Sequence, residues 1–554
     1  MSYFESFELR KECSFLLHIL EILTKKKGTH GIEWSDNSCT NNEMIKNLLE
    51  RDYPQLFNIA QEVLFHIDAR RLKYIAETDS KDALSSLNEY ELAWYYAQVF
   101  SDKRTPPMFM SRFVAESIAE QLLQKLPNKN FDKILCCSEN ALSVLVALSE
   151  HEVQIDFALP LRYNIITGLF IELIKLIGKA KIRVINLESN FKGLITLPEE
   201  TYQVGYYLMP MGLPEHWLLN LMNLERLAKH SIIMLEPGVI WSSKRDFYQL
   251  RQELVETHSL KAVIQLPVGV ISATNLSPTL LLLNKDKEQR TNRFLFADFS
   301  SEKLVKNKDA WSIPFKNLEN TRTTSIDEIR ANDYVLDPKR YEFGEGSLLT
   351  LLNHHNSEPL SSIADIIRAQ SIPISNEANI SSDIKKYHEV SPSDIDDIGF
   401  VAQPKKVILV AEEGKRRALQ AELHANDIIL AIKGSIGKVG LITENTFGEG
   451  CRCVAGQSFV IIRLKPYKWE EYSPEYLFRY LKTKIVQKYF ESFSLGTTIR
   501  MLKMSDVTGL PVKIPSQNEL QHEEKLHREQ IRIKKEILEM QNKLYQSEMN
   551  WPKK

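Results

Sequence analysis

The six cysteines of this chain are the side chains whose types and spacing are most readily tested for chemistry. They are Cys13, Cys39, Cys136, Cys137, Cys451 and Cys453. A zinc site needs about four ligands at a spacing near Cys-x2-Cys. Cys451 and Cys453 lie between turn signals, but the sequence offers them neither a second cysteine pair nor a close histidine. Cys136 and Cys137 are interpreted as small hydrophobic side chains at a strand end. We therefore expect no metal site and no disulfide framework of the secreted type.

Short apolar runs separated by turn signals fill residues 230–284, a pattern typical of an α/β fold. They predict a strand, a turn, a helix, a strand, a turn and a strand, with the turns at 236–238 and 267–269. This stretch, including Arg251, closely resembles the C-terminal half of the methyltransferase subunit of type I restriction-modification systems. The segment EIRANDYVLDPKRY at 328–341 resembles the end of the same fold. A generic α/β domain with chance similarity is the alternative.

The resemblance implies a Rossmann-like fold across residues 106–341 that transfers a methyl group from S-adenosylmethionine to the N6 atom of adenine in DNA. Such a fold needs a glycine-rich turn after its first strand, because a Cβ there would collide with the cofactor. The candidate strand lies in residues 132–148, and its turn contains no glycine. The turn is formed by Cys136, Cys137, Ser138, Glu139 and Asn140, followed by Ala141. We therefore expect no tight cofactor loop here and no bound cofactor.

The base-binding motif of this family is also altered. Adenine methyltransferases extrude the target base and hold it with polar side chains and an aromatic ring. In the family an Asn or Asp precedes the prolines of this motif, whereas the matching place in residues 202–217 reads Met209, Pro210, Met211 and Gly212. A thioether is a weak hydrogen-bond acceptor and cannot orient an amino group as a carboxamide does. An alignment shifted to residues 212–217 gains an aromatic ring but has no Asn or Asp before its proline.

Each of these two losses disables a different step of catalysis, so we predict a methyltransferase-like domain that is not an enzyme. The alternative is an active adenine-N6 DNA methyltransferase that uses S-adenosylmethionine. Its site would be sought at Tyr206, Tyr207, Glu215 and Trp217. Aromatic side chains beside a strand more often belong to the core.

The composition changes after Tyr341, and residues 342–358 are predicted to be a linker. A mixed domain follows at 359–517, where Asn426-Asp427 leads into a buried strand and residues 434–437 reverse the chain into the next strand. With the small loop at 496–498, this pattern resembles the target-recognition domain of type I specificity subunits. The resemblance implies a double-stranded DNA partner, whose bases such domains read from loops in the major groove.

The net charge of −2 gives no global signal for nucleic acid, so a DNA surface must come from local clusters of charge. Nine basic side chains of the predicted target-recognition domain are the candidates. They are Lys405, Lys406, Lys415, Arg416, Arg417, Lys433, Lys438, Arg500 and Lys503. A solvated face is the alternative for each of them, because charge runs are usually solvated.

Helices are predicted at both ends of the chain. Residues 1–105 have helical periodicity, with a wide apolar face in residues 12–25 and a helix start at 86–90. The C-terminal helix, residues 518–554, carries apolar positions at the spacing of a coiled-coil seam. These positions are Leu526, Ile533, Ile537, Met540 and Leu544. Because the chain has one recognition domain and one such helix, we expect a homodimer or a heteromeric complex with other subunits.

These patterns predict a multidomain α/β protein with a helical N-terminal domain, a Rossmann-like methyltransferase-type fold, an α+β target-recognition domain and a C-terminal coiled-coil helix. The predicted function is sequence-specific DNA recognition in a restriction-modification or anti-phage defence system, with recruitment of an active partner. A scaffold that binds only protein is a third alternative. The chain has no signal peptide, long apolar span or Walker-type phosphate loop. We therefore expect a cytoplasmic protein whose motor activity, if required, comes from another subunit.

Overall fold

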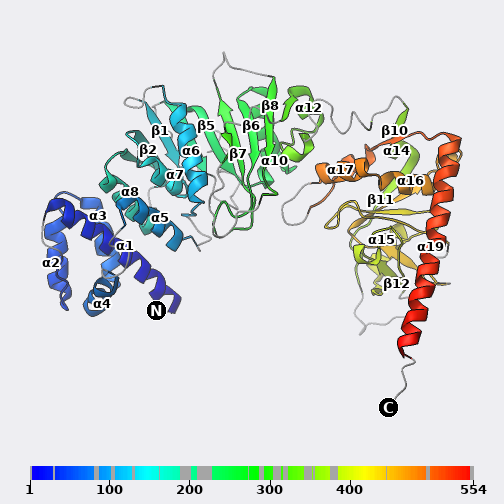
Figure 1. Ribbon diagram of the computed structural model, residues 1–554, viewed down its shortest axis with the longest axis horizontal. Coiled ribbons are helices and arrows are strands. Elements are labelled where there is room, and N and C mark those ends of the chain that lie inside the picture. Colours follow the sequence, from blue (N-terminus) through cyan, green and yellow to red (C-terminus); the bar gives the residue numbers. More distant parts are fainter. Residues whose placement is uncertain are drawn as a thin grey trace. The chain divides into compact units, whose positions relative to one another are not determined.

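A computed structural model of the chain is shown in Figure 1. It describes residues 3–28, 32–79, 87–101, 107–127, 132–160, 163–187, 201–208, 228–272, 274–285, 292–302, 313–315, 322–341, 352, 356–374, 385–444, 446–448, 450–494 and 500–549. The chain divides into two compact units, Met1–Pro338 and Lys339–Lys554. Arg340 belongs to the second unit, where its Nη2 donates to Oδ2 of Asp506 at 3.0 Å. The finer domain limits predicted above stay predictions.

A nine-stranded sheet runs through the described part of the first unit, in the order β3-β2-β1-β4-β5-β7-β6-β8-β9. Its strands are β1 (Lys133–Cys137), β2 (Gln154–Pro160), β3 (Lys181–Leu187), β4 (Tyr202–Leu208), β5 (Ala228–Leu235), β6 (Leu260–Gln265), β7 (Thr279–Asn284), β8 (Arg293–Asp298) and β9 (Arg322–Ser325). The five neighbouring strands β3, β2, β1, β4 and β5 pair in parallel. Strand β7 runs antiparallel between β5 and β6. The expected Rossmann-like order is therefore present, with the antiparallel strands β7 and β9 added.

Helices accompany this sheet, and α1 to α4 gather at one end of the unit (Figure 1). They are α1 (Tyr3–Lys27), α2 (Ser38–Leu49), α3 (Pro54–Phe65), α4 (Ala69–Asp79), α5 (Glu89–Val99), α6 (Arg112–Gln124), α7 (Leu142–Leu148), α8 (Ile165–Ile177), α10 (Gly238–Trp241), α11 (Arg245–Glu256) and α12 (Ile326–Ala331). The predicted helix start at 86–90 is confirmed, because Asn88 caps α5 by accepting from the backbone N of Glu91. The expected order of strands and helix in 230–284 is confirmed by β5, α11, β6 and β7.

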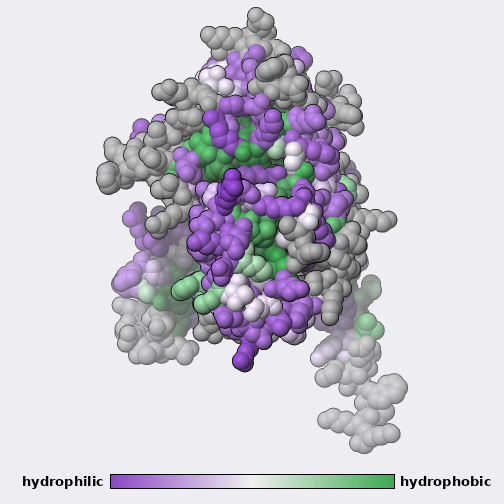
Figure 2. All heavy atoms as spheres, turned by 90° about the vertical axis from the view of Figure 1, so that its left-hand side faces the viewer, coloured by the Kyte–Doolittle hydropathy of each residue, from purple (hydrophilic) through white to green (hydrophobic). Residues whose placement is uncertain are grey.

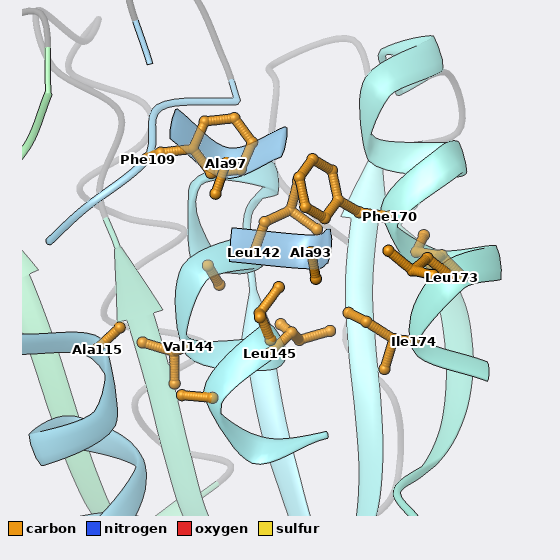
Figure 3. Packing of buried hydrophobic residues seen from close by; sticks show 14 of the residues in the cluster. Ala93, Ala97, Phe109, Ala115, Leu142, Val144, Leu145, Phe170, Leu173 and Ile174 are labelled. Carbon is orange, nitrogen blue, oxygen red and sulfur yellow. The ribbon is translucent and has the colours of Figure 1, made fainter. Parts of the chain in front are cut away.

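One apolar core joins the N-terminal helices to the helices of the sheet. Figure 3 shows Ala93 and Ala97 of α5, Leu142, Val144 and Leu145 of α7, and Phe170, Leu173 and Ile174 of α8 in this core. From α1, Phe15 stacks on Tyr96 with ring centroids 4.0 Å apart. Each large apolar side chain buried in this way contributes about 1.5–3 kcal/mol. The helical N-terminus and the sheet therefore support each other within one compact unit.

The second unit contains three small sheets in its described part. The largest is β11 (Ala364–Arg368), β17 (Phe459–Leu464), β14 (Ile428–Ala431) and β15 (Val439–Leu441), and a second contains β13 (Val407–Val410), β12 (Lys385–Val390) and β16 (Cys453–Ala455). Strand β10 (Ser357–Pro359) pairs with β18 (Pro511–Lys513). The predicted hairpin is confirmed by the antiparallel pairing of β14 and β15. Gly434 and Gly437 take positive φ angles of 76° and 80° in its turn, a conformation that glycine adopts at little cost.

Short helices and one long helix complete the second unit. They are α14 (Leu360–Ile363), α15 (Lys415–Gln420), α16 (Pro474–Leu481), α17 (Lys484–Phe493), α18 (Met504–Thr508) and α19 (Gln517–Met549). The predicted C-terminal helix is thus present as α19, which packs against α16.

The described surface is mainly hydrophilic on the face shown in Figure 2, and apolar residues gather there in patches. Among the described residues, no helix combines the length and the apolar character that crossing a membrane requires.

Candidate functional site

The turn after β1 lies at the carboxyl edge of the sheet, where a Rossmann-like fold binds its cofactor. Strand β1 ends at Cys137, and residues Glu139–Ala141 then form one turn of 3-10 helix before α7. Ser138 has φ of 85° and ψ of 142°, in a region of backbone space that is almost reserved for glycine. The backbone therefore keeps a glycine-type conformation at this turn, although the residue is serine.

The polar side chains of this turn bind the protein itself. Oδ1 of the buried Asn140 accepts from the backbone N of Met108 at 2.7 Å. Oγ of Ser143, also buried, accepts from the backbone N of Met110 at 3.0 Å. These two bonds hold the segment that leads into α6 against the start of α7.

The same leading segment is bound on its other side by the loop that follows β6. Met110 forms a bridge with Ile271. The backbone N of Ser111 donates to the carbonyl of Val270, and that of Ser272 to the carbonyl of Phe109, both at 2.8 Å. The segment is therefore fixed between the β1 turn and the β6 loop.

Glu139 connects the β1 turn to the start of α8. Its Oε2 accepts from the backbone N of Asn164 at 2.9 Å and from Oγ1 of Thr167 at 2.6 Å. Strand β2 ends with Leu159 and Pro160, whose side chains offer no acceptor. In dinucleotide-binding folds a carboxylate near the end of the second strand accepts a hydrogen bond from a ribose hydroxyl. In the described turn, Glu139 is instead used within the protein.

Strand β4 places two tyrosines beside β1, where the alternative prediction sought an active site. Tyr206 pairs in register with Cys136, and Tyr207 pairs with Cys137. All four are buried, and the hydroxyl of Tyr206 has no hydrogen-bond partner in the described structure. Burial raises the pKa of the Cys136 and Cys137 thiols and of Tyr206 above their ordinary values, so these groups stay protonated at neutral pH.

The predicted base-binding positions Met209, Pro210, Met211 and Gly212 lie outside the described residues, as do Glu215 and Trp217. Their loss of function stays a prediction from the sequence. Among the described residues, no group of three or more His, Cys, Asp or Glu side chains is placed to hold a metal ion.

The predicted basic residues of the second unit fall into separate groups. One group follows the β14–β15 turn, because Lys433 bridges to Met501 and the backbone N of Gly434 donates to the carbonyl of Arg500 at 3.0 Å. Lys438 lies at the other end of that turn, and Lys503 is the N-cap of α18. The turn therefore brings together the backbones of segments that are far apart in the sequence.

The second group is the start of α15. Lys415 is paired with Glu412, Arg416 is exposed, and Nη1 of Arg417 donates to the carbonyl of Ser371 at 3.0 Å. The pairing of Lys415 reduces the positive charge of this run.

The third group lies before β13. Lys405 is exposed, and Lys406 is paired with Glu389 at 2.8 Å. Whether any of the three groups contacts DNA stays a prediction.

A pocket of about 520 Å³ lies at the start of β14, at the opposite end of this strand from the β14–β15 turn. It is lined by His424, Ala425, Asn426, Asp427, Arg463, Leu464, Pro466 and Trp469. Its buried carboxylate, Asp427, binds Nε and Nη2 of Arg463, both at 2.7 Å. The sequence predicted the turn at Asn426-Asp427, but it gave no signal that Arg463, from a distant strand, would pair with Asp427.

The long helix α19 presents two different faces. Leu520 and His527 are buried, and Nζ of Lys534 binds Oδ2 of Asp396 at 2.7 Å, so these residues form the face toward the unit. The predicted seam lies about 110° further around the helix, at about 100° per residue. Leu526 is half-buried, and the other four seam positions have exposed fractions from 42% to 66%. The seam is therefore not part of the packing of α19 against its own unit.

Two family models match the chain. The N-6 DNA Methylase model covers residues 214–347, and the Type I restriction modification DNA specificity domain covers residues 360–547. The chain is a fusion of a methylase domain and a specificity domain. The sheet described above is thus a methyltransferase-type sheet. The methylase match begins at residue 214, after both the β1 turn and the segment Met209–Gly212.

Individual proteins resemble the chain more distantly. The Type I restriction enzyme MpnII methylase subunit of Mycoplasma pneumoniae is 26% identical over 152 residues, which cover 24% of this chain and 27% of the relative. The match thus spans about a quarter of that curated relative. Among solved structures, the type I methyltransferase subunit from Streptococcus thermophilus has 12% identity and a TM-score of 0.44, covering 60% of this chain and 92% of the other. The type IIG restriction endonuclease BpuSI has 10% identity and a TM-score of 0.41, covering 93% and 72%.

Proposed function

We propose that the specificity domain binds double-stranded DNA at a defined sequence, and that the methylase domain is catalytically inactive and recruits an active partner. The protein would act in a restriction-modification or anti-phage defence system in the cytoplasm. The observation that carries this proposal is the construction of the β1 turn. Its side chains Asn140 and Glu139 bind backbone and side-chain groups of the protein where a methyltransferase admits its cofactor.

The arrangement around the turn adds support. The backbone of a cofactor loop comes close to the cofactor at glycine residues, which have no Cβ. The turn after β1 has a Cβ at every position. The hydrogen bonds that Asn140 and Ser143 accept from the leading segment already occupy the polar side chains of this turn. Each such buried bond contributes about 1 kcal/mol, and leaving its partner unpaired costs more.

A calorimetric titration with S-adenosylmethionine tests whether the methylase domain has lost its cofactor site. We expect no heat of binding at concentrations where an active type I methylase subunit saturates in the same buffer. A dissociation constant in the micromolar range, about −8 kcal/mol, would contradict the proposal. Incorporation of a labelled methyl group into duplex DNA would contradict it more directly.

Ser138 favours a second candidate function, an active adenine-N6 methyltransferase with S-adenosylmethionine as donor. Its backbone angles are those of a glycine turn, so the shape that a cofactor loop needs is partly retained. The variant Ser138→Gly separates the two functions. Under the main proposal, relief of backbone strain stabilises the domain without producing cofactor binding. Under the alternative, affinity for the cofactor rises.

Recognition of DNA is tested by fluorescence anisotropy with random duplexes at two salt concentrations, followed by selection of bound sequences. We expect binding that weakens steeply with salt, because phosphate contacts release counterions. Absence of binding at low salt would favour the third function, a scaffold that binds only protein.

We further propose that a second copy of the chain covers the seam of α19. One specificity domain recognises one half-site, so two copies would place two domains on one DNA molecule. The exposed seam on a face that its own unit does not cover supports this assembly. A heteromeric complex with another subunit is the alternative outcome.

A further inference from the structure

Cys451 and Cys453 lie next to each other in the second unit, with their Sγ atoms 3.6 Å apart. Cys453 is the first residue of β16 and is buried, whereas Cys451 is partly exposed. Alternate residues of an extended strand are about 6.6 Å apart at Cα, near the upper end of the range for a disulfide. The side chains of such residues point to the same face of the strand.

A turn before β16 holds the first of the two cysteines. The backbone N of Cys451 donates to the carbonyl of Gly448 at 3.1 Å, and Gly450 has a positive φ of 74°. The second cysteine begins β16, where it pairs with His388 of β12, and its carbonyl accepts from the backbone N of Leu423 at 2.9 Å. Both backbones are therefore fixed while the two sulfur atoms remain within reach of each other.

The residue between the cysteines is fixed on the other side of the strand. Nε and Nη2 of Arg452 bind the two carboxylate oxygens of Glu422, each at 2.7 Å. The guanidinium also lies over the ring of Tyr387, 4.5 Å from its centroid. A bidentate pair supported by an aromatic ring resists rotation of the strand. Closure of the sulfur pair from 3.6 Å to the bond length of about 2.05 Å is thus left to side-chain rotation.

We propose that Cys451 and Cys453 form a reversible disulfide when a hydroperoxide oxidises the protein. The Cys451 thiolate attacks the O–O bond, giving a sulfenic acid at Cys451 and releasing an alcohol, or water when the oxidant is hydrogen peroxide. The Cys453 sulfur then displaces the sulfenic oxygen, so that an S–S bond forms, the S–O bond breaks and water leaves with the Cys453 proton. Two thiols are oxidised, and one hydroperoxide is reduced by two electrons.

The order of these steps follows from exposure. Cys451 is reached by solvent, and a thiolate is the nucleophile in the first step. Burial raises the pKa of Cys453 to about 12, so this residue stays a thiol until its neighbour has been oxidised. The disulfide would tie the Gly448–Cys451 turn to β16 and reduce its mobility. This inference does not depend on the function proposed above.

The other cysteines provide internal comparisons. Cys39 is exposed on α2, so it is open to the oxidant. Cys13, Cys136 and Cys137 are buried. We therefore expect the oxidant to reach Cys39 and Cys451 first, and we expect an intramolecular disulfide only at the Cys451–Cys453 pair.

The test treats the full-length protein with hydrogen peroxide at pH 8, unfolds it in denaturant, alkylates the remaining thiols and maps the peptides by mass spectrometry. We expect the peptide that carries both residues to lose 2 mass units, about the mass of two hydrogen atoms, and dithiothreitol to restore it. In Cys453→Ser, dimedone should trap a sulfenic acid at Cys451 that the wild type does not accumulate. In Cys451→Ser, Cys453 should stay alkylatable.

Two results would overturn the inference. One is complete alkylation of both residues after the Cys39 thiol has been consumed. The other is oxidation of Cys451 to a sulfinic acid in the wild type without the loss of two hydrogens. Cys39→Ser is the matched control, because it removes the other exposed thiol and should leave the disulfide unchanged. Hydrogen exchange gives a second readout, since amides of the turn should exchange more slowly in the oxidised wild type than in Cys451→Ser.

Discussion

The buried cation Arg251 ties together three segments of the methylase domain. Its Nε donates to the carbonyl of Tyr334 at 2.7 Å, Nη1 to that of Val239 at 2.7 Å, and Nη2 to that of Ser242 at 2.9 Å. Arg251 itself lies in α11, and its acceptors lie in α10, at the C-cap of α10 and in the chain after α12. Hydrogen bonds from a charged donor contribute about 1.5–3 kcal/mol each, so this residue organises the end of the domain.

We predict that Arg251→Met lowers the free energy of unfolding by about 3 kcal/mol or more, because buried carbonyls lose their donor. Urea denaturation followed by tryptophan fluorescence measures the change. Arg245→Met is the matched control, since Arg245 is exposed on the first turn of the same helix and should change stability by less than about 0.5 kcal/mol. Equal effects of the two variants would show that the three hydrogen bonds are not stabilising.

The residue scale also shows what the sequence could not predict. The lack of glycine in residues 136–141 was readable, because it depends only on residue types. The use of Asn140 to bind Met108 was not, because it pairs groups from segments separated by a strand. The same holds for Arg251, which the family resemblance singled out without a role, and for Asp427 with Arg463.

At the scale of elements, α19 begins with a reciprocal cap. The backbone N of Ser516 donates to Oε2 of Glu519 at 2.8 Å, and the backbone N of Glu519 donates to Oγ of Ser516 at 3.3 Å. This is a capping box, which satisfies two donors at the helix start. Nζ of Lys513 also donates to Glu519 at 2.6 Å. Hydrogen bonds from Lys513 and Ser516 lower the pKa of Glu519 to about 2.

We predict that this cap stabilises α19 at neutral pH and weakens in acid. A carboxyl whose pKa is depressed in the folded state contributes stability above its unfolded pKa, about 4.5, and loses it as the pH falls toward about 2. Glu519→Gln should therefore lower the thermal midpoint at pH 7, and the difference from wild type should shrink at pH 3. Glu539→Gln, exposed in the same helix, is the control. A difference that grows in acid would contradict the cap.

The basic start of α15 carries a prediction about DNA. Replacing Lys415, Arg416 and Arg417 together with alanine should weaken binding and flatten its dependence on salt. Each lost phosphate contact reduces the slope of log K against log salt by roughly 0.9. The pairing of Lys415 with Glu412 and of Arg417 with Ser371 predicts a loss smaller than three full contacts. Anisotropy titrations at several salt concentrations measure both quantities.

The control for this prediction removes the same charge elsewhere. Lys525, Arg528 and Lys535 are exposed on α19 at positions outside the seam. Their triple alanine variant should leave the salt slope unchanged. If both triple variants behave alike, the α15 run is a solvated face, and the group at the β14–β15 turn becomes the candidate for phosphate contacts.

For the whole molecule, sequence patterns predicted where helices and strands lie in the chain better than which of them pack into one core. Apolar periodicity and turn signals placed the strands of 230–284, the β14–β15 hairpin and both terminal helices, because these depend on neighbours in the chain. They did not show that α1 and α5 share one core with α7 and α8, since packing between distant helices is set by shape. Nor could periodicity alone show which face of α19 its own unit covers.

The face of α19 that its own unit leaves uncovered is available for assembly. Leu520, His527 and Lys534 hold α19 to its own unit, whereas Ile533 and Ile537 are 45% and 42% exposed on a different face. Burying such side chains against a second copy would stabilise association by roughly 1.5–3 kcal/mol each, before the cost of ordering. We predict that the protein is a dimer and that Ile533→Glu with Ile537→Glu gives a folded monomer.

Analytical ultracentrifugation at tens of micromolar, with circular dichroism to check folding, measures this change. Lys535→Glu introduces a negative charge on the opposite side of α19 and should leave the dimer intact. A two-fold assembly also requires a palindromic or bipartite DNA site, because the symmetry of the protein is repeated in its half-sites. The double variant should then bind an isolated half-site as well as the wild type does and lose its preference for the full site. A wild-type chain that is monomeric with and without DNA would exclude the homodimer and leave a partner subunit as the occupant of the seam.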